Sequence, residues 1–311
     1  MTGIVEEDIV MKQPSKTTIV AILLLFIQIT ELRAEEWRPE VKTLRVNQYD
    51  MAYVEKGSGP PLILVHGSLS DYRTWLHLFN ELSENNRTIA VSLRHFYPEQ
   101  WNGKGADLSL QQHADDITAF IQGIKAGPVS LLGHSRGGDV ALMVASQHPE
   151  LVRNLILADP APLATILANN PASMSFAKAR KAKLQEVVNY YQQNDAETGL
   201  QIYVKYIAGP TAWQNTSEQR REEIRSNSWT QISQLQDYET PFTCSMAAKI
   251  TAPVLLITGE RSAPVYGHMN SAVRACLKEV SIATIADAGH LMYYANPTAF
   301  AFEVVDFITS E

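Results

Sequence analysis

The sequence predicts an α/β fold with a mainly parallel, doubly wound sheet. Continuous apolar runs of β type alternate with amphipathic helical patterns along most of the chain. Runs without polar alternation indicate strands buried on both faces, as in parallel sheets covered by helices. The chain has 311 residues, of which 45% are hydrophobic. That is enough for one large domain with an insertion, or for two compact domains.

The elements follow in order from residue 43 onwards. Two strands around a turn are expected in 43–55, and further strands at 62–65, 88–92, 128–132, 154–158, 254–258 and 280–285. Between them, helices are expected near 71–83, 109–125, 137–148, 266–277 and 297–308.

One long stretch interrupts this alternation. From Pro160 to Ala252 the pattern is helical and contains no convincing strand. The stretch is too long for a connecting loop in a compact domain, so we expect a helical cap at 160–252, inserted into a core of 35–159 and 253–311. Helices are expected there at 173–193, 196–207 and 217–226.

Two groups of cap side chains stand out. The first is basic, and its expected role is a solvated helix face, with an anion-attracting rim as the alternative. The second is aromatic, and we expect most of it to pack and one or two members to face a substrate pocket. The basic group is Lys178, Arg180, Lys181 and Lys183. The aromatic group is Tyr190, Tyr191, Tyr203, Tyr206, Trp213 and Trp229.

The amino terminus carries an uncharged apolar run at 17–30, TTIVAILLLFIQIT. It is shorter than the roughly 20 residues that span a membrane. Basic residues precede it and the small Ala34 follows, which favours a signal peptide over 1–34 and export to a periplasmic or extracellular location. An uncleaved anchor through 17–30 is the alternative. Met11 offers a second start that would give an ordinary basic leader.

Charge and cysteine content exclude several classes. With 26 basic and 33 acidic residues, the formal net charge of −7 argues against an electrostatic nucleic-acid binder. Cys244 and Cys276 are too few for a disulfide scaffold or a Cys-rich zinc site, and they are either paired or two free buried thiols. Since no phosphate-binding glycine loop, HExxH pair or EF-hand loop occurs, we expect no cofactor and no metal.

A nucleophile motif follows the strand at 128–132. Gly133-His134-Ser135-Arg136-Gly137 leads directly from that strand into a helix. A G-x-S-x-G sequence in a strand–turn–helix context is typical of a nucleophile elbow, in which a strained turn exposes the serine. Side chains at positions 133 and 137 would collide with the adjoining strand and helix.

Two flanking motifs complete the pattern: His66-Gly67-Ser68 upstream and Asp287-Ala288-Gly289-His290 downstream. With them, residues 40–309 resemble the α/β-hydrolase superfamily, in its cap-bearing, serine-nucleophile branch. The resemblance implies that Ser135 is the nucleophile and His290 the general base. It also implies that the backbone N–H groups of Ser68 and Arg136 form the oxyanion hole, and that His66 and His134 act as supports.

The acid of the triad departs from the commonest family pattern. Most relatives place an aspartate after the strand at 254–258, in a G-x-x-D turn, but here the turn is Gly259-Glu260-Arg261-Ser262. Asp159 is favoured as the substitute, since it ends the strand at 154–158 and catalytic groups of open α/β sheets gather at carboxyl strand ends. Glu260 is the alternative, and Asp287 a third.

These residues predict a serine hydrolase that cleaves a small ester, lactone or related acyl substrate through an acyl-enzyme. Dehalogenases and epoxide hydrolases of this superfamily attack with an aspartate at the elbow, whereas Ser135 indicates attack on an acyl carbon. Carbon–carbon bond hydrolysis and perhydrolysis would use the same triad. A non-catalytic ligand-binding protein or receptor on a degenerate fold is the alternative from another class. The expected partner is a small molecule, with no nucleic acid and no stable membrane partner after signal cleavage; the oligomeric state stays open.

Overall fold

The computed structural model describes residues 38–310, apart from 106, 162, 168–170, 238 and 239. The predicted signal peptide at 1–34 lies outside these residues. Within the described part of the chain, no helix combines the length and the apolar character needed to cross a bilayer. The chain divides into the units Met1–Glu40 and Val41–Glu311, and every element below belongs to the second.

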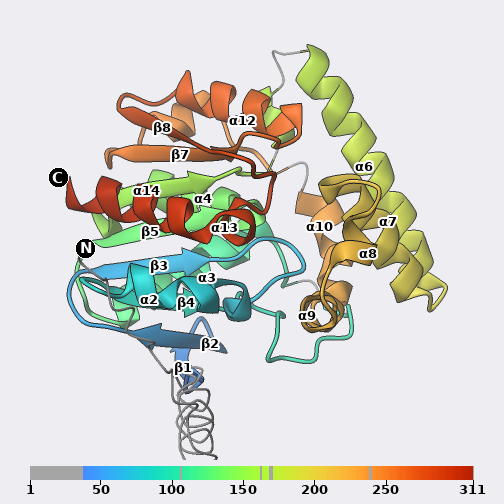
Figure 1. Cartoon of the computed structure of the whole chain (residues 1–311), viewed down its shortest axis with the longest axis horizontal. Helices are drawn as coiled ribbons and strands as arrows, with labels where there is room; N and C mark the ends of the chain where they lie inside the picture. The colour runs from blue at the N-terminus through green and yellow to red at the C-terminus, as the bar shows by residue number, and fades with distance from the viewer. Residues whose placement is uncertain (1–37, 106, 162, 168–170, 238–239, 311) are drawn as a thin grey trace, which may run out of the picture. The chain divides into compact units, whose positions relative to one another are not determined.

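An eight-stranded sheet runs through the second unit in the order β1-β2-β4-β3-β5-β6-β7-β8 (Figure 1). The pairs β1–β2 and β2–β4 are antiparallel and all the others are parallel, which confirms the predicted fold class. The strands are β1 (Lys42–Val46), β2 (Tyr49–Lys56), β3 (Pro61–Val65), β4 (Arg87–Val91), β5 (Val129–His134), β6 (Val152–Ala158), β7 (Val254–Gly259) and β8 (Val280–Ile285).

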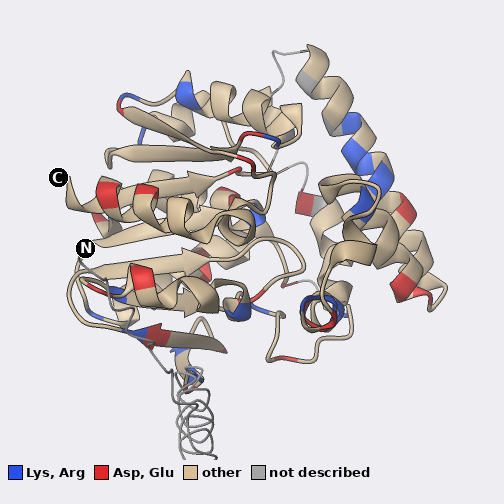
Figure 2. Ribbon diagram, in the orientation of Figure 1, with Lys and Arg blue, Asp and Glu red and all other residues tan. Residues whose placement is uncertain are grey.

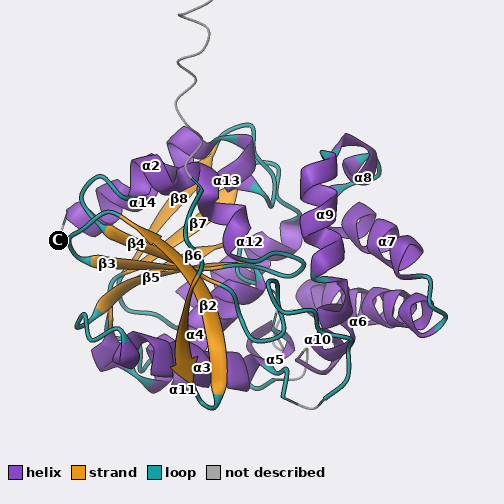
Figure 3. Cartoon of the chain, turned by 90° about the horizontal axis from the view of Figure 1, so that it is seen from below, coloured by secondary structure: helices purple, strands orange, loops and turns teal. Residues whose placement is uncertain are grey.

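Helices cover both faces of the sheet (Figure 3). On one face lie α2 (Phe79–Leu82), α13 (Met292–Ala295) and α14 (Pro297–Thr309). The 3-10 helix η1 (Tyr72–Leu78) leads directly into α2. On the other lie α3 (Leu110–Gly123), α4 (Arg136–Gln147) and α11 (Cys244–Ala247). Buried residues of α12 (Pro264–Arg274) join the same hydrophobic cluster as α3 and α4, and η2 (Pro149–Leu151) links α4 to β6.

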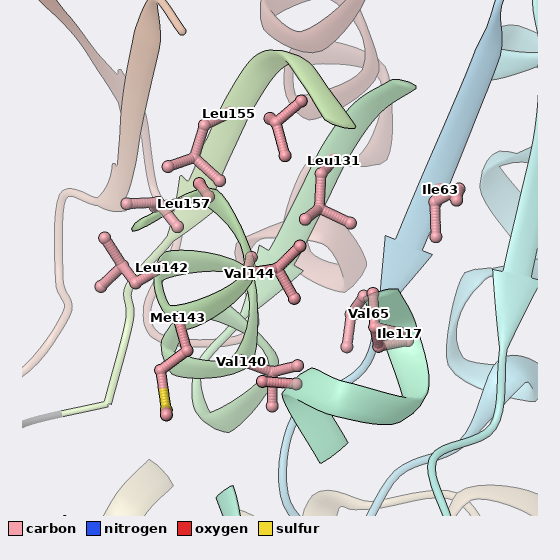
Figure 4. Packing of buried hydrophobic residues seen from close by; sticks show 14 of the residues in the cluster. Ile63, Val65, Ile117, Leu131, Val140, Leu142, Met143, Val144, Leu155 and Leu157 are labelled. Carbon is pink, nitrogen blue, oxygen red and sulfur yellow. The ribbon is translucent and has the colours of Figure 1, made fainter. Parts of the chain in front are cut away.

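The core explains why the strands appear as continuous apolar runs. Alternate residues of neighbouring strands point to α4 and pack on its buried side (Figure 4). The intervening residues Leu62 and Leu64 are also 0% exposed, so the central strand β3 is buried on both faces. The packed set includes Ile63, Val65, Leu131, Leu155 and Leu157 from the strands and Val140 and Val144 from α4.

Between β6 and β7 the described residues form helices and no strand. The helices expected at 173–193, 196–207 and 217–226 correspond to α6 (Pro171–Gln192), α7 (Ala196–Ala208) and α9 (Glu218–Ser226). The shorter ones are α5 (Ala164–Leu167), α8 (Ala212–Asn215), η3 (Ser228–Thr230) and α10 (Gln231–Asp237). Apart from α5, they share a hydrophobic cluster that also includes Leu69 of the loop after β3. Leu167 of α5 belongs to the cluster of the core. Since Val41–Glu311 is one compact unit, the bounds 160–252 for a separate cap stay a proposal.

Cys244, at the start of α11, and Cys276, just after α12, form a disulfide with a Cα–Cα distance of 5.0 Å. The sequence left this pairing open. The bond ties the last helix before β7 to the helix after it, so it closes a loop around that strand.

Removing this disulfide should lower the free energy of unfolding. A cross-link over a sequence separation of 32 destabilises the unfolded chain by about 4 kcal/mol through lost chain entropy. We therefore expect a Cys244→Ser/Cys276→Ser variant to unfold at lower urea concentration than the oxidised wild type. Dithiothreitol should shift the wild type to the same midpoint and leave the variant unmoved. Equal midpoints for oxidised wild type and variant would contradict the expectation.

Candidate active site

Ser135 lies at the tight turn between β5 and α4. Its backbone has φ 52° and ψ −121°, a conformation that is strained for a residue with a side chain. Two bonds to the neighbouring strand hold the turn: the Ser135 N–H donates to the Ala158 carbonyl at 3.0 Å, and the Ala161 N–H donates to the Ser135 carbonyl at 3.1 Å. A side chain at Gly133 would collide with the Gly137 backbone, and one at Gly137 with the Val65 carbonyl. The predicted elbow is therefore present.

His290 follows β8 and is 7% exposed. Its Nδ1 lies 3.3 Å from Oδ2 of Asp159. Its backbone carbonyl accepts a hydrogen bond from Nε2 of His134 at 2.9 Å. Burial, together with the nearby His290, holds the pKa of His134 well below its usual range, so His134 is a neutral donor. The ring of Tyr266 stacks on that of His290 at a centroid distance of 4.0 Å, which fixes the plane of the imidazole.

The Asp159 carboxylate, at the end of β6, is completely buried. Three side chains surround it: the Thr258 hydroxyl donates to Oδ1 at 2.7 Å, and the Ser262 hydroxyl donates to Oδ2 at 2.5 Å. His290 is the third, on Oδ2. The sequence did not identify Thr258 or Ser262 as partners of this carboxylate.

The two other candidate acids lie elsewhere. Glu260 is exposed, and its Oε2 accepts a hydrogen bond from the backbone N–H of Asp287 at 2.9 Å. The side chain of Asp287 is exposed and forms an ion pair with Arg261. The structure thus brings Asp159 to His290 and keeps Glu260 and Asp287 in an outer turn.

The loop that carries Ser68 packs against the elbow. A side chain at Gly67 would meet His134 and Ser135. His66 anchors the loop: its Nδ1–H donates to the Gly67 carbonyl at 2.8 Å, and its Nε2 accepts from the Leu93 N–H at 3.0 Å. Burial lowers the pKa of His66 to about 4, so this histidine is neutral and both of its nitrogens are satisfied. Among the described residues, no acceptor is bonded to the backbone N–H of Ser68 or of Arg136.

A cavity of about 250 Å³ opens over Ser135 and His290, between the core and the helices that follow β6. Most of its wall is apolar or aromatic, and of the six aromatic cap residues singled out in the sequence, Tyr203 and Tyr206 line it. The lining from the core includes Ser68, Ser135, Tyr266, His290 and Leu291, and that from the cap helices includes Phe176, Arg180, Ile207, Arg220 and Ile224.

Side chains of α10 contact two residues close to Ser135, Arg136 and Ser68. The Arg136 guanidinium pairs with Asp237 at 2.5 Å, and its other end contacts Nδ1 of His113 at 3.1 Å. The Ser68 hydroxyl donates to Oε1 of Gln234 at 2.6 Å. These contacts attach the cap to both sides of the elbow.

Arg180 departs from the expected solvated helix face. Basic residues gather along α6 (Figure 2). Of these, Lys178 and Lys181 are exposed, whereas Arg180 lines the cavity. Sequence proximity was misleading, because successive helical residues point about 100° apart. The spacing along the helix could have placed Arg180 on the inner face. Leu184 and Val187, four and seven positions after it, lie on the same face and are both 0% exposed. No comparable signal in the sequence marks Tyr266 as a neighbour of His290.

Within the described residues, no group of three or more His, Cys, Asp or Glu side chains is placed to hold a metal ion. The polar groups of the cavity are instead a hydroxyl, an imidazole backed by a buried carboxylate, and two guanidinium groups.

Comparison with known proteins assigns the family. The model of the alpha/beta hydrolase family matches residues 62–304. A candidate 2-succinyl-6-hydroxy-2,4-cyclohexadiene-1-carboxylate synthase of Bacillus subtilis is 24% identical over 85% of this chain and 95% of its own length. A soluble epoxide hydrolase of Corynebacterium is 32% identical over 38% of this chain and 40% of its own. An esterase structure from Exiguobacterium antarcticum superimposes with a TM-score of 0.73 and 20% identity, covering 87% of this chain and 100% of the esterase. Since the family match extends over most of the chain, the protein belongs to the alpha/beta hydrolase family.

Proposed function

We propose that the protein is a serine hydrolase that cleaves a small ester, lactone or related acyl compound. One observation carries the proposal: Ser135, on a strained turn, and His290, backed by the buried Asp159, line the same cavity. Membership of the alpha/beta hydrolase family supports a hydrolase in general. A serine at the elbow favours attack on an acyl carbon.

In the first half of the proposed reaction, Ser135 Oγ attacks the acyl carbon and Nε2 of His290 accepts its proton. Asp159 faces Nδ1, so it holds the tautomer that leaves Nε2 free and stabilises the imidazolium. The carbonyl oxygen becomes an oxyanion that the backbone N–H groups of Ser68 and Arg136 stabilise. His290 then protonates the leaving alkoxide, which leaves an acyl group on Ser135.

In the second half, water attacks the acyl group and His290 accepts one of its protons. The tetrahedral intermediate collapses, Ser135 recovers its proton from His290, and a carboxylic acid is released. One water is consumed in each turnover; with a lactone, the acid and the alcohol stay in one molecule. A cavity of about 250 Å³ favours a small substrate, and its apolar lining favours one with hydrocarbon or aromatic surface.

We also propose that the protein is exported. Disulfides persist in oxidising compartments, and the bond between Cys244 and Cys276 supports such a location. The apolar run at 17–30 supplies the matching signal in the sequence.

A fluorophosphonate probe tests the nucleophile first. We expect the wild type to be labelled stoichiometrically at Ser135 and a Ser135→Ala variant to fold normally but remain unlabelled. The variant should lose at least about 10³-fold in ester hydrolysis, because the acyl-enzyme cannot form. Intact-protein mass spectrometry measures the labelling and circular dichroism controls for folding. A folded wild type that resists the probe would instead support a ligand-binding protein on this fold.

Matched variants test the acid. Asp159→Asn should lower kcat by about 10³- to 10⁴-fold, since a neutral amide neither fixes the productive tautomer nor stabilises the imidazolium. Glu260→Gln removes one carboxylate from the exposed turn and should change kcat by less than about twofold, as is usual for surface substitutions. Steady-state kinetics on the same ester measures both, and the reverse ranking would reject Asp159 as the acid.

Export makes a prediction about the mature chain. Mass spectrometry of the protein recovered from outside the cytoplasm should find an amino terminus near Glu35. Retention of residues 17–30 on a membrane-associated protein would support an uncleaved anchor, and a full-length cytoplasmic protein would contradict export.

A further inference from the structure

Two arginines from the cap line the cavity above Ser135: Arg180 from α6 and Arg220 from α9. A positive charge in an apolar cavity is costly unless a negative group accompanies it. For each arginine, the negative counter-charge comes either from the protein itself or from a bound ligand.

The protein neutralises Arg220. Its guanidinium forms an ion pair with Glu223, whose side chain is 8% exposed. It also donates to the Ser70 hydroxyl at 2.7 Å and lies 5.3 Å from the centre of the Tyr294 ring. These partners belong to α9, the loop after β3 and the segment after His290. Arg220 thus joins the cap to the core and has a direct ion-pair partner within the protein.

Among the residues that the structure describes, Arg180 has no such partner. No ion pair in this part of the chain joins its guanidinium to a carboxylate, and Tyr203 lines the same cavity. Arg180 lines a small second cavity together with Asp139, which is buried, and Asp237, which pairs with Arg136. Burial raises the pKa of Asp139 well above its usual range, which disfavours its charged form. The Asp159 carboxylate already accepts from Thr258, Ser262 and His290.

We infer that Arg180 binds a carboxylate of the substrate, so that the substrate class is an ester or lactone carrying one free carboxylate. The inference rests on the proposed hydrolase activity of Ser135. A guanidinium matches a carboxylate with two parallel hydrogen bonds. A positive charge without an ion-pair partner among the described residues suits a singly charged carboxylate better than a doubly charged phosphate, which would leave excess charge in an apolar cavity. The aromatic and aliphatic wall covers the rest of such a substrate.

Protection of Ser135 against the fluorophosphonate tests this assignment without requiring turnover of any chosen ester. The competitors are monomethyl glutarate, an anionic ester, and dimethyl glutarate, its neutral counterpart. A second pair, 3-acetoxypropanoate and its methyl ester, places the carboxylate on the alcohol side. In the wild type we expect the anionic member of at least one pair to protect at a concentration at least about tenfold lower than the neutral one, the range for a charge-assisted contact.

Three variants sharpen the result. Arg180→Gln should abolish the preference for the anionic ester, measured within the variant as the ratio of the protecting concentrations of the two members of a pair. Arg180→Lys keeps the charge and should retain part of the preference, and it replaces the glutamine variant if that variant does not fold. Lys178→Gln removes one positive charge from the exposed face of the same helix and should leave the preference unchanged, which controls for long-range attraction.

The failures are distinguishable. Normal labelling with equal protection by both members of each pair, or with no protection by either, overturns the carboxylate site and leaves the serine hydrolase standing. The same holds if Arg180→Gln keeps the wild-type preference. If Ser135 is not labelled at all, the proposed hydrolase fails, and the carboxylate assignment that rests on it fails as well.

Discussion

The arrangement of the site depends on one buried carboxylate. Asp159 is 0% exposed, and an unpaired charge in that position would cost several kcal/mol. Its three donors come from the end of β7, from the turn after β7 and from the loop after β8. The hydrogen bonds to this one carboxylate therefore connect the carboxyl-terminal ends of β6, β7 and β8. The Asp159 backbone N–H adds a fourth tie, to the Ile257 carbonyl at 2.9 Å.

A second buried charge, that of Arg136, connects the core to α10. Arg136 follows Ser135 in the sequence, and its guanidinium pairs with Asp237, whose Oδ1 also accepts from the Leu110 N–H at 2.8 Å. Buried ion pairs add little net stability, but they are costly to break, so they specify position. With Gln234 bonded to Ser68, the cap contacts the residues whose backbone N–H groups form the proposed oxyanion hole. A displacement of α10 would disturb both, so the cap's position and the geometry over Ser135 are coupled.

Local patterns in the sequence predicted most of the fold, because strand and helix periodicity depends on neighbouring residues. The elbow was predictable for the same reason: the strand, the glycines around Ser135 and the helix are contiguous. Asp159 required an additional argument, that carboxyl ends of parallel strands meet at one edge. Contacts such as Tyr266 on His290, or the pairing of Cys244 with Cys276, depend on how whole elements pack, and composition does not encode that packing. Arg180 was misjudged because its charge was grouped with neighbours in sequence instead of with residues one helical turn away.

The sequence departure at Ser262 becomes intelligible from the same geometry. β6 and β7 are paired in parallel, with Ala158 opposite Ile257, so a residue following either strand can approach His290 from the same side. The carboxylate of Asp159 directly follows β6, and Ser262, in the turn after β7, donates to it at 2.5 Å. An aspartate at 262 would place a second carboxylate against Asp159, and two carboxylates sharing one buried site cannot both ionise easily. Asp159 and Ser262 are therefore complementary: with the proposed acid directly after β6, a hydrogen-bond donor, and not a second acid, is the suitable residue in the turn after β7.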